Sequence, residues 1–539
     1  MPRRLEQHLP PLVAGLLLAA PVLLVPWPPS SDLALHEGMI GLLAGRGDPT
    51  FAPPGLYRLA LGHTNQLLYL LAWPLARLTG PALACRLLLA ATIVATLVAA
   101  GHLAAHLGKT RWAALAVAPV ALGWSFYWGF VPQMLGFALF LALLPRLDRD
   151  ARRGRPAAAL SSSLAIAGLG LAHVSSMLCA CVAVAVFTLA LPLDRRTPPR
   201  LAPAAVGVCL ALLEDRWDRA IATPLAQLLS SRVLWHPLGR KLGSVVTYLI
   251  GAHGAIAQAA VALLVLVAVV LWRTAAPPSP SPSGARSPGP LAWLDRNRFA
   301  VLASLLFALY LAAPYSLNFG AFFYVRFLAP AFTLAVLVAA PGEAARGPLV
   351  VAPALALLLA PLAIALPQLA AATAQTRALE PLLGRIERGS SVAVIHLGKY
   401  DHALLFDPTS LGNRVLGERG GRELASFTEY PIAPVVIAPA LRWDSIVLRT
   451  SARSGALQPA TDLRRIAWVL VSLHDPGLAP LVARAFEPEA RLEAASGEWM
   501  LFHSRLPQLP LTAPDAEPDA SAETLQDRVT RALRGRAPP

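Results

Sequence analysis

The fold is decided by residues 27–80, which read WPPSSDLALHEGMIGLLAGRGDP at 27–49 and HTNQLLYLLAWPLARLTG at 63–80. An apolar run, residues 9–25, precedes this stretch, and another, residues 81–107, follows it. The stretch therefore places carboxylates at the mouth of a membrane helix, where a charge is costly unless it serves a purpose. Its acidic residues are the first candidates for function.

The composition indicates a membrane protein. Hydrophobic residues make up 56% of the 539 residues and charged residues only 14%, whereas a soluble chain has about 25% charged residues. The net charge of +15 comes from short basic clusters between the apolar runs, not from one basic stripe with interleaved aromatics. This distribution is typical of the positive-inside rule, so nucleic acid is not an expected partner.

Apolar runs predict an all-α polytopic fold with about eleven transmembrane helices. The predicted spans are 9–27, 81–107, 112–126, 129–145, 157–173, 175–193, 201–214, 254–272, 299–314, 328–341 and 348–366. Segment 61–79 is interpreted as interfacial and is not counted as a span. This count of spans places the basic loops at 108–111, 146–156, 194–200 and 342–347 on the cytoplasmic side. The alternative is that 61–79 is an ordinary span and that the charge rule fails.

The same count of spans predicts the domain organisation. Arg3 and Arg4 precede the first apolar run, which predicts a signal anchor with a cytoplasmic N-terminus. Residues 1–366 form the membrane domain, with a first outer loop at 28–80. Strand-like segments at 391–398, 466–473 and 498–504, with a helix at 476–486, predict a small extracytoplasmic α/β domain over 367–506. Residues 507–539, rich in Pro, Ala, Asp and Glu, are predicted to be a disordered tail up to a helix at 522–534.

The order of these features resembles the GT-C superfamily of membrane glycosyltransferases, which includes protein mannosyltransferases and the aminoarabinose transferase of lipid A. The family's His-Pro-Pro-Leu-Tyr type segment corresponds to HTNQLLY at 63–69, which keeps the histidine and the aromatic residue but neither proline. The pairing of Trp128-Gly129-Phe130 with FTEYPIAPV (427–435) also resembles a further branch of bacterial membrane proteins. The resemblance implies a polyprenyl-phosphate sugar donor, an acceptor of unknown identity, and an active site on the outer face of a bacterial cytoplasmic membrane.

Such a transferase needs a base for the acceptor proton, and Asp32 and Glu37 are the catalytic candidates. Asp32 lies where the resemblance places an acidic residue; the alternative is that it caps a helix starting at Leu33. His36 is a substrate-binding candidate on the same helix. Asp32, His36 and Glu37 are interpreted as sharing one face, which could hold a divalent metal. Two carboxylates are few for a hard cation, so no metal ligands and no cofactor are assigned.

A leaving lipid phosphate needs cations. Arg326, flanked by Tyr324 at the outer end of a span, is expected to clamp the phosphate, with interfacial snorkelling as the alternative. Arg58 and His63 in the first outer loop are further phosphate or sugar contacts. A second function class, a non-catalytic or transport component of envelope glycan or lipid assembly, stays open. The few mid-membrane charges and the lack of an evident inverted repeat favour the transferase.

The charge pattern predicts a topology. Reporter fusions at Ala151 and Ala285 should be cytoplasmic and fusions at Gly47 and Gly455 external, because the basic clusters fix the parity. An external signal at Ala151 would contradict the interfacial interpretation of 61–79.

Overall fold

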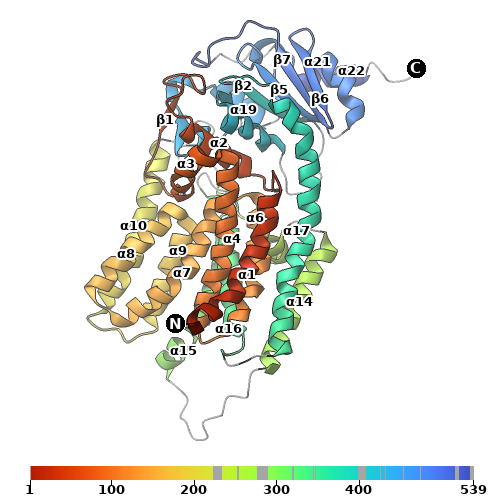
Figure 1. Cartoon of the computed structure of the whole chain (residues 1–539). Helices are drawn as coiled ribbons and strands as arrows, with labels where there is room; N and C mark the ends of the chain where they lie inside the picture. Colours follow the sequence, from red (N-terminus) through yellow and green to blue (C-terminus); the bar gives the residue numbers. More distant parts are fainter. Residues whose placement is uncertain are drawn as a thin grey trace.

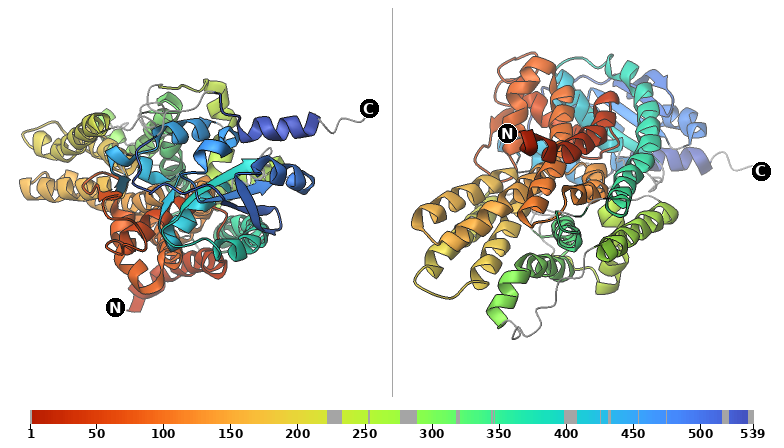
Figure 2. Two further views of the ribbon diagram at one scale, coloured as in Figure 1. Left: turned by 90° about the horizontal axis from the view of Figure 1, so that it is seen from above. Right: turned by 60° about the horizontal axis from the view of Figure 1, so that its bottom comes forward.

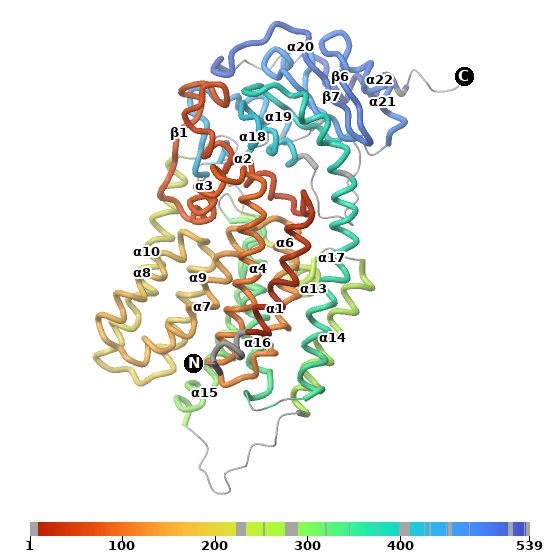
Figure 3. Tube along the Cα trace, viewed as in Figure 1, coloured from red at the N-terminus to blue at the C-terminus, as the bar shows by residue number. Residues whose placement is uncertain are grey.

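The computed structural model describes residues 2–221, 233–251, 254–275, 289–317, 321–343, 345, 347–397, 408–424, 426–430, 433–452, 454–473, 475–515 and 521–534. It shows a helical bundle with an α/β domain at one end, and the N-terminus lies at the other end (Figures 1 and 3). Ala285 and His474 lie outside the described residues.

The bundle is built from apolar helices. Its centre is α4 (Pro81–His106), which packs against α1 (Pro2–Leu24) and α7 (Val131–Arg153). The other main helices are α8 (Pro156–Ala172), α9 (Val174–Leu189), α10 (Thr197–Ala220), α14 (Ala255–Ala275), α15 (Pro290–Ala312), α16 (Leu328–Ala339) and α17 (Pro348–Leu383). Within the described residues, four helices are long and apolar enough to cross a membrane: α4, α7, α14 and α17. The count of eleven spans stays a prediction.

In the structure, two segments differ in detail from the helices predicted for them. The expected span 112–126 is broken into η1 (Arg111–Val117), α5 (Ala118–Ala121) and α6 (Trp124–Trp128). Pro119 and Gly123 lie at the breaks, as expected for helix-disrupting residues. Segment 61–79 forms α3 (Leu67–Thr79), whose 13 residues span about 20 Å, less than the ~30 Å hydrocarbon core of a membrane. Its interfacial placement stays a prediction.

The boundary expected at residue 366 lies inside a helix, because α17 continues without a break to Leu383 and joins the bundle to the α/β domain (Figure 1). That domain contains a mixed sheet in the order β3-β2-β5-β7-β6. Its strands are β2 (Ser391–Leu397), β3 (Arg422–Glu423), β5 (Trp468–Leu473), β6 (Ala490–Ser496) and β7 (Trp499–Ser504). β2, β5 and β7 match the three predicted strands, and η7 (Pro476–Leu478) with α21 (Ala479–Phe486) matches the predicted helix.

The tail expected from residue 507 contacts the α/β domain where the structure describes it, and its last helix lies within the helix expected at 522–534. The indole Nε1 of Trp443 donates to the carbonyl of Ala513 over 3.0 Å. α22 (Leu525–Arg534) buries Leu525 completely, and Arg528 forms an ion pair with Glu489 at 2.8 Å. The polar composition of this segment gave no indication of the few apolar and charged contacts that hold it against the domain.

The loop over residues 28–80 and the C-terminal domain interlock. β1 (Tyr57–Leu59) pairs antiparallel with β4 (Val435–Ile437), although the two lie far apart in the sequence. α2 (Leu33–Ala44) packs against α18 (Gly412–Arg419). Gly41 makes the helix contact possible, because a Cβ there would overlap the backbone of Gly417. Figure 2, seen from above, shows the C-terminal domain lying over the first loop and the bundle.

We expect Gly41→Ala to lower the free energy of unfolding by about 1–3 kcal/mol, the usual effect of overpacking a close contact. Gly168→Ala is the matched control, because a Cβ at this helical glycine meets no atom within 4 Å. Thermal unfolding of the two purified variants gives the comparison. Equal stability of both variants would show that the α2–α18 contact is not tight.

Candidate functional site

Asp32 is held by its backbone against the turn that follows α6. The amides of Ser31 and Asp32 donate to the carbonyls of Tyr127 (3.0 Å) and Trp128 (2.9 Å). Gly129 closes this turn with φ +86°, and a Cβ there would come within 2.6 Å of the Asp32 amide nitrogen. Only glycine fits both the left-handed conformation and the close approach. The Trp128-Gly129-Phe130 turn therefore fixes where Asp32 sits.

The Asp32 side chain is half-buried and makes no capping hydrogen bond to α2, although Asp32 occupies the N-cap position. The hydrogen bond that the helix-cap alternative requires is therefore not formed. Burial raises the pKa of the Tyr430 phenol to about 12, and the negative charge of Asp32 adds to that rise. Asp32 also lies within electrostatic range of Arg326. Asp32 therefore lies within electrostatic range of an arginine and a tyrosine.

His36 braces this arrangement. Its Nδ1 lies 2.7 Å from the Tyr69 hydroxyl and its Nε2 lies 3.1 Å from the Gly129 carbonyl oxygen. Because a carbonyl only accepts, Nε2 carries the proton and Nδ1 accepts from Tyr69. Burial lowers the pKa of His36 to about 4, so the ring is neutral at pH 7. With both nitrogens engaged, His36 positions the start of α2 and offers no ligand atom.

Glu37 points elsewhere, so the expected Asp32–His36–Glu37 trio does not form. Five residues along an α-helix is a rotation of about 140°, which turns Glu37 away from the Asp32 face. Its carboxyl is buried at the α2–α18 contact, within the electrostatic reach of Arg414 and Arg86. Burial raises the pKa of Glu37 to about 7. The interpretation that these three side chains share a face is wrong.

Arg326 points into the protein. Its Nη1 lies 2.7 Å from His173 Nε2, and its guanidinium stacks 5.1 Å from the centre of the Phe130 ring. It borders a cavity of about 20 Å³ whose lining is part polar, including Ser175, Ser176 and Gln133, and part apolar. This volume holds about one water molecule. The buried Arg326 Nε has no hydrogen-bond partner among the described residues. These contacts do not match the snorkelling alternative.

Two other predicted residues lie away from Asp32. Tyr324 is completely buried, and its hydroxyl lies 3.2 Å from the Tyr248 hydroxyl and 3.0 Å from His236 Nδ1. It packs behind Arg326 and does not line the cavity. Arg58, on β1, is exposed and borders a separate open cavity together with Arg46. A direct contact of Tyr324 or Arg58 with a substrate at Asp32 therefore stays a prediction without a supporting geometry.

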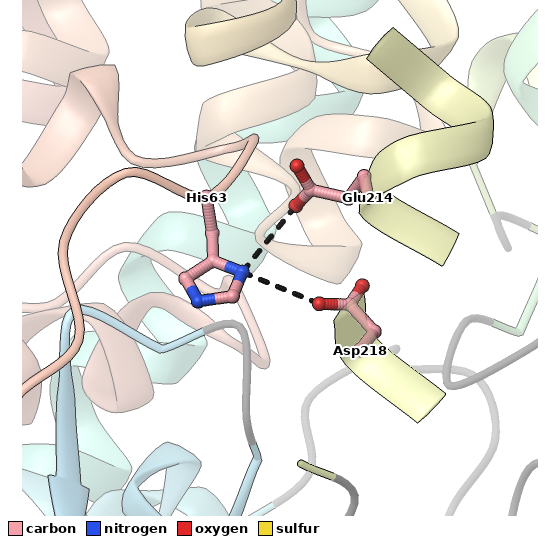
Figure 4. A group of neighbouring side chains, drawn as sticks. All are labelled: His63, Glu214 and Asp218. Atoms are coloured by element: carbon pink, nitrogen blue, oxygen red, sulfur yellow. Dashed lines mark ion pairs between the residues drawn. The ribbon is translucent and has the colours of Figure 1, made fainter. Parts of the chain in front are cut away.

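His63 belongs to a cluster that the sequence analysis missed. Its Nδ1 lies 3.6 Å from Glu214 Oε1 and 3.2 Å from Asp218 Oδ1, both on α10 (Figure 4). Glu214 also accepts hydrogen bonds from the Thr64 amide (2.8 Å) and hydroxyl (3.1 Å). The hydrogen bonds from His63 to Asp218 and Glu214 raise the pKa of the imidazole to about 9. The sequence feature that could have indicated this cluster is the pair of carboxylates Glu214 and Asp218, spaced i, i+4 at the end of an apolar helix.

This cluster can hold a divalent cation. One ligand atom from each of His63, Glu214 and Asp218 lies within 4.8 Å of the others, and no other such group occurs in the described chain. One imidazole and two carboxylates suit zinc or manganese. Asp218 is buried at the cluster, and its Oδ1 lies 3.2 Å from His63 Nδ1. A cation would have to displace the proton on His63.

No protein-family model matches the chain, and no curated protein matches it. One solved structure resembles it: the crystal structure of ArnT from Cupriavidus metallidurans in the apo state, with 12% sequence identity and a TM-score of 0.48. The likeness covers 91% of this chain and 97% of that one. At this identity and score it assigns neither a family nor an activity.

The His63 ion pairs should make stability depend on pH in metal-free buffer. The folded pKa of about 9 lies above the ordinary value near 6.5, so the ion pairs stabilise the folded state fully below that value. The contribution is lost as pH rises through about 9. The difference in melting temperature between wild type and His63→Gln should therefore be largest at pH 6 and small at pH 10. A difference that is constant over this range would exclude a charged His63. Asp475→Asn, an exposed cap far from the cluster, is the control.

Proposed function

We propose that the chain is a GT-C-type glycosyltransferase that moves a sugar from a polyprenyl-phosphate donor to an acceptor on the outer face of a bacterial cytoplasmic membrane. The observation that supports this best is a half-buried carboxylate, Asp32, within electrostatic range of the inward-pointing guanidinium of Arg326. These two groups are the base and the cation that the reaction requires.

The chemistry follows from the two charges. Asp32 accepts the proton of the acceptor hydroxyl or amine while the acceptor atom forms a bond to the anomeric carbon. The bond between that carbon and the phosphate oxygen breaks, and the leaving lipid phosphate gains negative charge. Arg326 stabilises that charge by hydrogen bonds from its guanidinium. Its Nε, buried without a described partner, is a donor available for the phosphate.

The surrounding residues hold these groups in place. His36 and the Gly129 turn fix the backbone at Asp32, and His173 fixes Arg326. His173 is itself fixed, because its Nδ1 carries the ring proton and donates to the Ser175 hydroxyl at 2.7 Å at the start of α9. A divalent cation held by His63, Glu214 and Asp218 would add positive charge near the first outer loop for the phosphate. The proposed reaction does not depend on it.

The test is release of polyprenyl phosphate from labelled polyprenyl-phosphate sugars by the full chain in phospholipid vesicles, with an envelope lipid extract as the acceptor source. Asp32→Asn keeps the size of the side chain and removes the base, so we expect turnover to fall by roughly 10²- to 10⁴-fold. Donor retention in native mass spectrometry should stay at the wild-type level, because Arg326 is unchanged.

Asp48→Asn is the matched control, because Asp48 is an exposed turn residue of the same loop that accepts from the Thr50 amide at 2.9 Å. It should react as wild type. Undiminished turnover of a folded Asp32→Asn protein would remove Asp32 from the mechanism. Failure of the wild-type chain to retain any of the donors would count against the transferase itself.

A further inference from the structure

A second cavity lies within the membrane helices, apart from the Asp32 site. It has a volume of about 500 Å³ and lies between α13 (Val245–Ile250), α15, α16 and the last turn of α14. Its lining is apolar except for Ser304 and Arg273. Figure 2, with the bottom of the molecule turned forward, shows α14 at the margin of the bundle, where it packs mainly on α17.

Small side chains of α16 create this groove. Ala331, Ala335 and Ala339 follow Leu328 at three- and four-residue spacing, so they form one face of the helix, and all four line the cavity. From Leu328 to Ala339 this face is about 16 Å long, about half of the ~30 Å hydrocarbon core. The groove therefore has the length of one membrane leaflet, which suits a single acyl chain better than a long polyprenyl chain.

The charges lie at one end of the groove. Arg273 is exposed in the last turn of α14, at the end of the bundle away from the C-terminal domain (Figure 1). Lys109 is close by: burial lowers the pKa of its ammonium, and the positive charge of Arg273 lowers that pKa further. Lys109 Nζ donates to the Ala340 carbonyl over 2.7 Å, which holds it beside the end of α16.

Among the described residues, no carboxylate forms an ion pair with Arg273 or Lys109. The opposite end of the groove is lined by Val245, Leu249 and Leu328, which offer nothing to a charged headgroup. An amphiphile in this groove must therefore place its anionic group at Arg273 and Lys109 and its chain toward Leu328.

We propose that this groove binds one anionic glycerophospholipid, with an acyl chain along α16 and the headgroup phosphate at Arg273 and Lys109. The donor lipid is the less suitable occupant, because its phosphate would have to lie at the Arg326 end of the bundle. The lipid fills the space between α15 and α16 that the alanines leave open, and it joins α14 to the rest of the bundle through Arg273.

The test uses the full chain reconstituted in vesicles of phosphatidylcholine with one-fifth phosphatidylglycerol, followed by native mass spectrometry of the extracted protein. We expect one phosphatidylglycerol to be retained in preference to phosphatidylcholine. Arg273→Gln should weaken that preference roughly five-fold, the usual effect of one basic residue on anionic lipid binding. Arg296→Gln, an exposed arginine at the same end of the bundle, is the control and should retain the lipid.

Ala335→Trp should fill the groove and abolish retention, whereas Ala260→Trp, at an exposed position of α14 outside the lining, should not. If Ala335→Trp does not fold, Ala335→Leu replaces it in the same measurement. Equal retention of both phospholipids, retention that survives in a folded groove variant, or displacement of phosphatidylglycerol by polyprenyl phosphate would each overturn the proposal. Loss of a dimer in the Ala335 variant would instead assign the groove to a second copy of the chain and would also overturn it.

Discussion

The packing of α2 on α18 is the contact on which the candidate site depends. Gly41 lies directly against Gly417, and Gly38 against Asn413. On the other side of Asp32, the Arg414 guanidinium stacks 3.6 Å from the centre of the Trp27 ring, just beyond the end of α1. The short peptide that carries Asp32 is therefore fixed at both ends by one helix of the C-terminal domain. The domain is part of the site, although it contributes few groups that could touch a substrate.

Glu37 shows how this contact is held together. Its carboxyl is buried where α2, α4 and α18 meet, and Arg414 and Arg86 both lower a pKa that burial raises. Arg86 also donates to the Val25 carbonyl over 2.9 Å, so the same arginine ties α4 to the end of α1. Burying a carboxylate is costly unless cations compensate for the lost hydration. Glu37 is thus placed to join three helices, and its catalytic role stays a prediction.

Local patterns predicted the local elements. The strands at 391–397, 468–473 and 499–504 and the helix ending at Phe486 follow from apolar periodicity, which depends only on neighbouring residues. The contacts that build the site could not be predicted in this way. Thr64, next to His63, meets Glu214 across a separation of 150 residues, and β1 meets β4 across a still longer one. Nothing in either segment of such a pair identifies its partner. Asp32 and Arg326 could be identified as candidate site residues from the sequence, because a charged residue beside an apolar run is unusual whatever its tertiary contacts are.

The basic residues of the bundle differ according to whether a carboxylate is within reach. At the end away from the C-terminal domain, Asp148 binds Arg298 at 2.6 Å and His106 at 2.8 Å, which joins α4, α7 and α15. Arg152 and Asp295 pair at 2.6 Å in the same network. These carboxylates form ion pairs that join helices to one another. With 46 basic and 31 acidic residues in the chain, many cations must find other anions. Arg273 lies at that end beside an apolar cavity and Arg326 borders a small cavity at the other, so lipid phosphates are the anions proposed as their partners.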